Sequence, residues 1–210
     1  MKDVQATIII DLEGRNAEDL LKQADRSRRK NISKAKDSGL IFKEADEQEF
    51  QEYHRIYSSV WKDGGVNPEP IGKLMQHKDY KLFVAKKDKK VIGGGLIEIR
   101  KGGINFVAFA SSMEYQEMRV NDFLYWNCIL YALNRKMRYV DLGGYQLKPR
   151  GHMQGINTFK EKWGGRIVMR EVNGNILYLL GRKAIRNVPA ARWLWDRIKG
   201  RPVSAKDKRE

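Results

Sequence analysis

A carboxylate and a phenol, two residue types that can do chemistry, lie on either side of two glycines in this chain. Asp141 lies in the short apolar run 139–142, and Tyr145 follows Gly143 and Gly144. A carboxylate at a strand end that faces a cleft can accept a proton from a reacting amine. It can equally accept a backbone hydrogen bond from two residues on, as in an Asx turn. Both readings of Asp141 stay open, and Tyr145 is either a hydroxyl contact to substrate or a partly buried tyrosine with its hydroxyl in solvent.

Positive charge is concentrated in two segments of the chain. The 210 residues include 41 Lys and Arg and 26 Asp and Glu, which gives a net charge of +15; residues 22–37 contribute +5 and residues 182–210 contribute +7. Such segments attract RNA, anionic lipid or phosphorylated substrates, although each is also explained by a solvated helix face. Arg28, Arg29 and Arg119 are the candidates for phosphate contacts, because a guanidinium binds phosphate in bidentate geometry. Ordinary surface charge is the alternative for all three.

Other reactive residue types are too sparse for metal or thiol chemistry. The one cysteine, Cys128, falls on the apolar side of a helical pattern and is expected to fill the core. His54, His77 and His152 are far apart in the chain, so the sequence predicts no metal site and no disulfide. The N-terminus lacks the basic and apolar blocks of a signal peptide, and no stretch approaches the ~18 apolar residues of a membrane span. We therefore expect a cytoplasmic protein.

Hydrophobic periodicity from residue 40 onward predicts alternating strands and helices. One helix follows Asp46, its predicted N-cap, and a long one begins at Asn121, also a predicted cap. Asn173-Gly174 predicts a tight hairpin, and the glycines 93–95 inside a strand pattern predict a bulge or close backbone packing. The expected strands are 40–44, 81–86, 91–99, 104–110, 139–142, 166–172 and 176–180, and the expected helices include 71–77, 121–136 and 153–163.

Segments on both sides of this region complete the predicted organisation. Residues 1–39 are expected to form an extension, with the strand TIIIDL and a basic helix over about 17–37. The core is 40–181, residues 182–200 contain a basic amphipathic helix, and 201–210 form a disordered tail. Tryptophans 193 and 195 suit that last helix to an anionic lipid surface. Packing on its own sheet or on a partner subunit is the alternative.

The order of these elements, β-α-α-β-β-β-α-β-α-β-β over 40–181, resembles that of the GNAT acyltransferase fold. The resemblance implies an α+β domain with a single mixed, mostly antiparallel sheet flanked by helices. It also implies strands that part between 104–110 and 139–142. Acetyl-coenzyme-A users of this fold carry a glycine-containing loop that holds the pyrophosphate. The corresponding stretch here, 111–126, contains no glycine.

Three segments resemble a further family, the Fem-type peptidyltransferases (FemABX). They are RSRRKNISKAKDSGL, NDFLYWNCILYALNRKMRYVDLGGY and NTFKEKWGG, and the most specific matches are Tyr139-x-Asp141-x-Gly143 and Phe159-Lys160 followed by Gly164-Gly165. Fem enzymes use a GNAT fold to move an amino acid from aminoacyl-tRNA onto an amine of a peptidoglycan precursor. The resemblance places Phe159 and Lys160 beside the acceptor and the ester, with the lysine holding the oxyanion. A core phenylalanine and a solvent-facing lysine are the structural alternatives.

The resemblance thus implies an aminoacyltransferase that forms an amide on an amine acceptor. It implies aminoacyl-tRNA as donor with no bound cofactor, and an anionic acceptor met at the inner face of the membrane. Fem enzymes normally contain two GNAT-like halves and this chain has room for one, so a homodimer or another chain would complete the cleft. The alternatives are a coenzyme-A-dependent N-acyltransferase, with acetyl-coenzyme A as donor, and a non-catalytic module that binds RNA or membrane.

Overall fold

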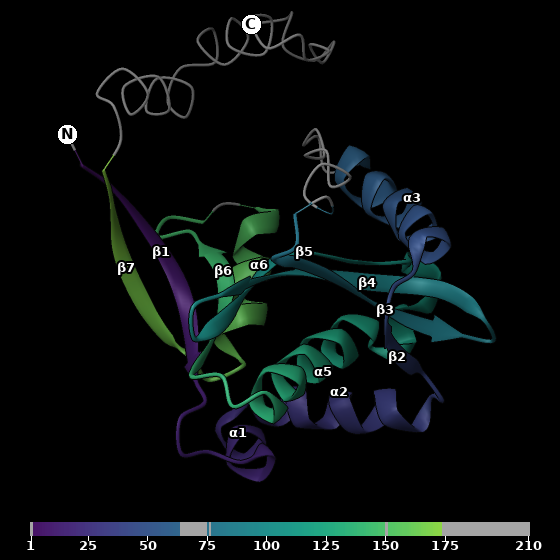
Figure 1. The fold of residues 1–210 in the computed structure, drawn as a ribbon, viewed down its shortest axis with the longest axis horizontal. Coiled ribbons are helices and arrows are strands. Elements are labelled where there is room, and N and C mark those ends of the chain that lie inside the picture. Colours follow the sequence, from purple (N-terminus) through teal and green to yellow (C-terminus); the bar gives the residue numbers. More distant parts are fainter. Residues whose placement is uncertain (1, 64–74, 76, 150, 174–210) are drawn as a thin grey trace, which may run out of the picture. The chain divides into compact units, whose positions relative to one another are not determined.

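The computed structural model describes residues 2–63, 75, 77–149 and 151–173 (Figure 1). Its chain contacts define two units, 6–168 and 1–5 with 169–210; of the second, only the outer ends of two strands are described. The elements are β1 (Lys2–Asp11), α1 (Ala17–Gln23), α2 (Arg26–Asp37), β2 (Ile41–Glu44), α3 (Glu47–Asp63), β3 (Tyr80–Lys87), β4 (Lys90–Arg100), β5 (Gly103–Ser111), the 3-10 helix η1 (Met113–Met118), α5 (Val120–Asn134), β6 (Tyr139–Tyr145), α6 (His152–Glu161) and β7 (Arg166–Asn173).

The described strands form one seven-stranded sheet in the order β2-β3-β4-β5-β6-β1-β7. β2 to β5 are an antiparallel meander, β5 and β6 are parallel, and β6 and β1 are antiparallel. The predicted mixed, mostly antiparallel sheet flanked by helices is confirmed. One expectation is corrected: the segment 1–39 is no appendage, because β1 lies inside the sheet beside β6, and α2 packs against α5.

Helix ends follow the capping chemistry, with two departures from the sequence prediction. Asp46 caps α3 as predicted, accepting the Glu49 N–H at 2.9 Å. The basic helix predicted over 17–37 is instead two helices, because Asp25 accepts the Ser27 N–H at 2.8 Å and so starts α2 afresh. α5 follows Arg119, in the left-handed conformation (φ 55°), so the predicted cap Asn121 lies in the first turn. Burial of Val120 fixes this earlier start.

Two of the three glycines of β4, Gly93 and Gly94, allow helices to approach both faces of the sheet. A Cβ on Gly94 would lie 2.5 Å from the Tyr53 ring of α3, whereas one on Gly93 would lie 2.8 Å from Val120 of α5. Successive strand residues face opposite sides, so α3 and α5 cover opposite faces. The predicted close backbone packing is therefore confirmed. The buried core on the α5 face includes Ile8, Ile10, Ile97, Ile104, Trp126, Cys128, Ile129, Val140 and Leu142.

Several predictions fall outside the described residues. They are most of the helix over 71–77, the hairpin at Asn173-Gly174 with its strand 176–180, the C-terminal helix and the tail. None of the helices in the described part of the chain has the length and apolarity to cross a bilayer. Within the same residues, no three His, Cys, Asp or Glu side chains gather in a way that would bind a metal.

Candidate active site at the parting of two strands

β5 and β6 pair only at their beginnings. The parallel register joins Gly103, Ile104 and Asn105 to residues 139–141, and the ladder between the two strands ends there. The predicted parting of these strands is thus confirmed. It begins at Gly143 of β6, which has φ 76° and passes so close to the Phe106 carbonyl that a Cβ would lie 2.6 Å from that oxygen. Only glycine meets both conditions without strain.

Lys160 of α6 places its ammonium at this parting. Its Nζ donates a hydrogen bond of 2.8 Å to the Gly144 carbonyl. The side chain is partly buried, and this loss of solvation lowers the pKa of Lys160 to about 8, against an upward effect of the Asp141 charge. At pH 7 a lysine with that pKa is protonated in about ten molecules of eleven. The structure therefore holds a cation next to the point where the strands separate.

Asp141 is deeply buried, at 2% exposure, and bonded within the protein. Its Oδ1 accepts the Gly143 N–H at 2.9 Å and the hydroxyl of Thr7, and its Oδ2 lies 3.9 Å from the Arg100 guanidinium. The Asx-turn geometry, one of the two readings of Asp141, is what the structure shows. The general-base role of Asp141 remains a prediction.

Phe159 and Arg28 lie together on the α5 side. The Phe159 ring packs edge to face on Tyr125, with centroids 4.9 Å apart, and contacts the main core. The Arg28 guanidinium lies 4.7 Å from the centre of the Phe159 ring and 2.8 Å from Asp122. Its side chain is 12% exposed, so a phosphate would have to displace Asp122 to reach it. Packing is the contact that the structure assigns to Phe159.

The other predicted binding residues are dispersed. Arg29 donates to carbonyls at the end of α1, among them Lys22 O at 3.2 Å, and Arg119 lies 4.0 Å from Glu117. The Tyr145 hydroxyl donates to Glu161 at 2.6 Å, which raises the pKa of Tyr145. Lys160 and Asp141 are therefore brought together, and Tyr145 is bonded to Glu161, the residue that follows Lys160, whereas the three arginines have partners elsewhere.

Two functional candidates were missed in the sequence, Thr7 and Asp122. Thr7 sits in an apolar strand run, where a buried threonine has no distinguishing pattern. Asp122 is buried in the first turn of α5. Its carboxylate pairs with the Arg28 guanidinium and accepts a hydrogen bond from the Asn31 side-chain amide. Burial raises the pKa of Asp122 above its ordinary value, and the Arg28 charge opposes that rise. The first turn of α5 therefore contains a buried carboxylate of the protein itself, that of Asp122.

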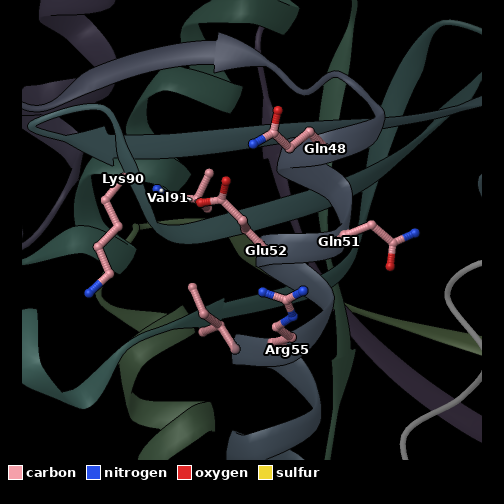
Figure 2. A pocket seen from close by; sticks show the side chains of 7 residues that line it. Gln48, Gln51, Glu52, Arg55, Lys90 and Val91 are labelled. Carbon is pink, nitrogen blue, oxygen red and sulfur yellow. Dashed lines mark hydrogen bonds between the residues drawn. The ribbon is translucent and has the colours of Figure 1, made fainter.

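A separate hollow of about 580 Å³ lies between α3 and the start of β4. Figure 2 shows Gln48, Glu52 and Arg55 projecting from α3 near Lys90 and Val91 of β4. Glu52 accepts the Val91 N–H at 3.2 Å, which ties the helix to the strand. None of the site residues predicted from sequence lines this hollow.

The sheet order and the parting of β5 and β6 are those of a GNAT-like acyltransferase domain. The family model described as "Acetyltransferase (GNAT) domain" matches residues 22–161, which is more than half of the chain. The chain therefore belongs to the GNAT acetyltransferase domain family. No curated protein matches it by sequence.

Solved structures with the same fold support this assignment. FemX is similar with a TM-score of 0.70 and 15% identity, over 83% of this chain and 63% of its own. The C-terminal domain of a protein from Agrobacterium fabrum, designated a lysylphosphatidylglycerol synthetase, is similar with a TM-score of 0.61 and 15% identity. The match covers 88% of this chain and 66% of that one. L-PGS from Bacillus licheniformis is similar with a TM-score of 0.60 and 13% identity, over 81% of this chain and 60% of its own. This chain thus spans less than two thirds of each, and identities this low establish the fold alone.

Proposed function

We propose that this chain transfers an aminoacyl group from aminoacyl-tRNA to an amine and so forms an amide. The observation that carries the proposal is the Lys160 ammonium, fixed by the Gly144 carbonyl where β5 and β6 part. The reaction converts an ester carbonyl into a tetrahedral oxyanion. A preorganised cation in a partly dry site lowers the energy of that charge, and one such group is commonly worth about 10² to 10³ in rate.

The reaction balances without a nucleophilic residue or a cofactor. The acceptor amine attacks the ester carbonyl, the new C–N bond forms, and the C–O bond to the tRNA ribose breaks. The amine proton leaves with the ribose oxygen, directly or through water. Lys160 remains an ammonium throughout, which agrees with its charge state at pH 7. Phe159 supports the lysine by packing α6 onto Tyr125.

The surroundings of α5 favour tRNA over coenzyme A as donor. Where a pyrophosphate loop would lie, the chain has η1, with the exposed carboxylates Glu114 and Glu117, and the first turn of α5 contains Asp122. Glu114, Glu117 and Asp122 pair with Lys90, Lys34 and Arg28 respectively, so the cations nearest to that helix end are already engaged by carboxylates of the protein. By contrast, α2 presents exposed cations to a polyanion, namely Arg26, Arg29, Lys30 and Lys36, whereas Lys34 pairs with Glu117 at 3.0 Å.

The acceptor in this proposal is an amine on an anionic, peptidoglycan-like precursor. The similarity to FemX supports that choice, and the lysylphosphatidylglycerol synthetase neighbour makes an acceptor at the membrane surface the next one to test. Because this chain spans 63% of the FemX chain, a homodimer or a partner chain would supply the rest of the cleft.

The test follows the ester bond directly. A pool of tRNA charged with radiolabelled amino acids is incubated with the chain and an amine acceptor, and loss of label from tRNA is compared with its appearance in amide. We expect the wild type and Lys160→Ala to differ by about 10²-fold or more. Lys162→Ala, two residues further on, is the matched control for removing a lysine from this region.

A parallel arm addresses the other donor. Acetyl-coenzyme A replaces the charged tRNA, and the released thiol is measured with the same acceptors. Acetyl-coenzyme A is the second candidate donor because the matching family is described as an acetyltransferase domain. Lys160-dependent thiol release, with no effect on aminoacyl-tRNA, would replace the proposed donor by coenzyme A.

A further inference from the structure

We propose that Thr7 of β1 is a positioning residue of the Lys160 site, acting through Asp141 to fix the turn whose carbonyl receives the lysine. The inference rests on the proposed function for its catalytic meaning, although its structural content can be measured without any substrate. Nothing in the chain's local sequence links Thr7 to Asp141, since 134 positions separate them. The insertion of β1 beside β6 brings them together.

A β-bulge explains why the two side chains meet. Thr7 pairs with Gly144 and Ile9 pairs with Asp141, so β6 contains one residue more than β1 over this stretch. With Gly143 at φ 76°, the irregularity has the form of a bulge built on a left-handed glycine. Such bulges bend a strand and redirect the side chains beside it. Here the bulge lets a residue of β1 reach a carboxylate of β6 on the same side.

The hydroxyl of Thr7 closes this bulge with two contacts. It is bonded to Asp141 Oδ1 and lies 2.9 Å from the Gly143 carbonyl oxygen, with Thr7 only 7% exposed. Asp141 Oδ1 also accepts the Gly143 N–H. Asp141 therefore holds the Gly143 N–H, and the Thr7 hydroxyl, which has one proton to donate, lies within reach of both Asp141 and the Gly143 carbonyl. The next carbonyl, that of Gly144, receives Lys160 at 2.8 Å.

The charged groups around the turn are few among the described residues. Asp141 of β6 attracts the Lys160 ammonium, and Arg100 of β4 lies behind Asp141 at 3.9 Å. Glu98, also on β4, pairs with Arg100 at 2.7 Å. Glu161 follows Lys160 on α6 and accepts the Tyr145 hydroxyl. Loosening the Thr7 contact changes none of these charges, so it isolates the effect of position.

The experiment measures the ionisation of Lys160 in the full-length protein. Lysines are labelled with trace acetic anhydride across a pH series, and the Lys160 peptide is quantified by mass spectrometry. In Thr7→Val, which has nearly the same shape but no hydroxyl, we expect Lys160 to leave the turn and its pKa to move from about 8 toward 10.5. Labelling at pH 8 then falls by on the order of tenfold or more, because less neutral amine is present.

Matched variants make the result specific. Thr7→Ser keeps the hydroxyl and is expected to retain the wild-type profile. Thr158→Val makes the same chemical change on an exposed face of α6, and we expect it to leave the Lys160 labelling profile unchanged. If Thr7→Val does not fold, Thr7→Cys replaces it, because a thiol is a weak donor to Asp141 and an intermediate profile is expected.

The two proposals fail in different ways. A folded Thr7→Val, or Thr7→Cys in its place, with an unchanged Lys160 labelling profile would overturn the positioning role. A shifted profile with no aminoacyl transfer by the wild type would leave the role intact and refute the proposed function. In the transfer assay the loss in Thr7→Val should appear in kcat more than in KM, with recovery in Thr7→Ser.

Discussion

Replacing Lys160 by methionine should stabilise the protein while it abolishes transfer. The difference between the ordinary pKa of 10.5 and a folded value of about 8 corresponds to at most ~3.4 kcal/mol against folding. Since the side chain is only partly buried, solvent screening reduces this to about 1–2 kcal/mol. Methionine has a similar length and no charge. The Gly144 carbonyl that it leaves belongs to an exposed residue and can bond to water.

The pH dependence gives this prediction its sign. The folded pKa of Lys160 lies below that of the unfolded chain, so between about pH 8 and 10.5 the unfolded state binds more protons. The wild type therefore gains stability relative to Lys160→Met as the pH rises through that window. Below pH 8 the full advantage of the methionine variant is present. Urea unfolding of both proteins at pH 7 and pH 10 measures the two differences.

A destabilised Lys160→Met variant would contradict this prediction. If Lys160→Met were less stable than wild type at pH 7, with a difference independent of pH, then the ammonium would be a favourable structural group. The reasoning that it is held in an unfavourable place for chemistry would be refuted. Lys162→Met is the control, because any general effect of a surface methionine would appear there as well.

Three further predictions concern the framework and the donor. Gly94→Ala should cost about 1–3 kcal/mol in urea unfolding, since its methyl meets the Tyr53 ring; an unchanged midpoint would show that the ring can move. Asp46→Ala should cost about 1 kcal/mol by removing the α3 cap, and Asp46→Asn should restore most of it. Replacing the exposed α2 cations Arg26, Lys30 and Lys36 with alanine should flatten the salt dependence of tRNA binding. The slope should change by about 0.9 for each duplex phosphate that the variant no longer neutralises, and equal slopes would exclude α2 as the tRNA contact.

Much of the fold could be predicted because its elements have strong local patterns. The meander over 80–111 shows in short apolar runs separated by polar turns, and each of its three strands extends one residue beyond the predicted range at both ends. The long helix from Val120 shows in its continuous apolar positions. Asp46 could be identified as a cap because a carboxylate precedes a helical pattern. These signals involve residues close together in the chain.

The site could be predicted only in part, because its contacts join distant segments. Phe159-Lys160 and Asp141 were identified through the Fem-like motifs, and the structure places Lys160 at the parted strands. The Thr7 contact depends on β1 entering the sheet between β6 and β7, which no local pattern encodes. The Arg28 pair with Asp122 likewise depends on how α2 packs on α5. In a sequence, Arg28 looks the same whether it faces a phosphate or a carboxylate.

The charges behind Lys160 explain how the fold tolerates a cation at this position. Signs alternate from Lys160 to Asp141, Arg100 and Glu98, so the series is neutral as a whole. Asp141 is 3% exposed in its side chain, whereas Arg100 and Glu98 are 36% and 24% exposed, so both residues behind Asp141 are better solvated than it is. Neutralising Asp141 would leave two cations facing one another near the buried end. The same carboxylate that fixes the bulge therefore also offsets the cost of the ammonium, which ties the geometry of the site to its charge.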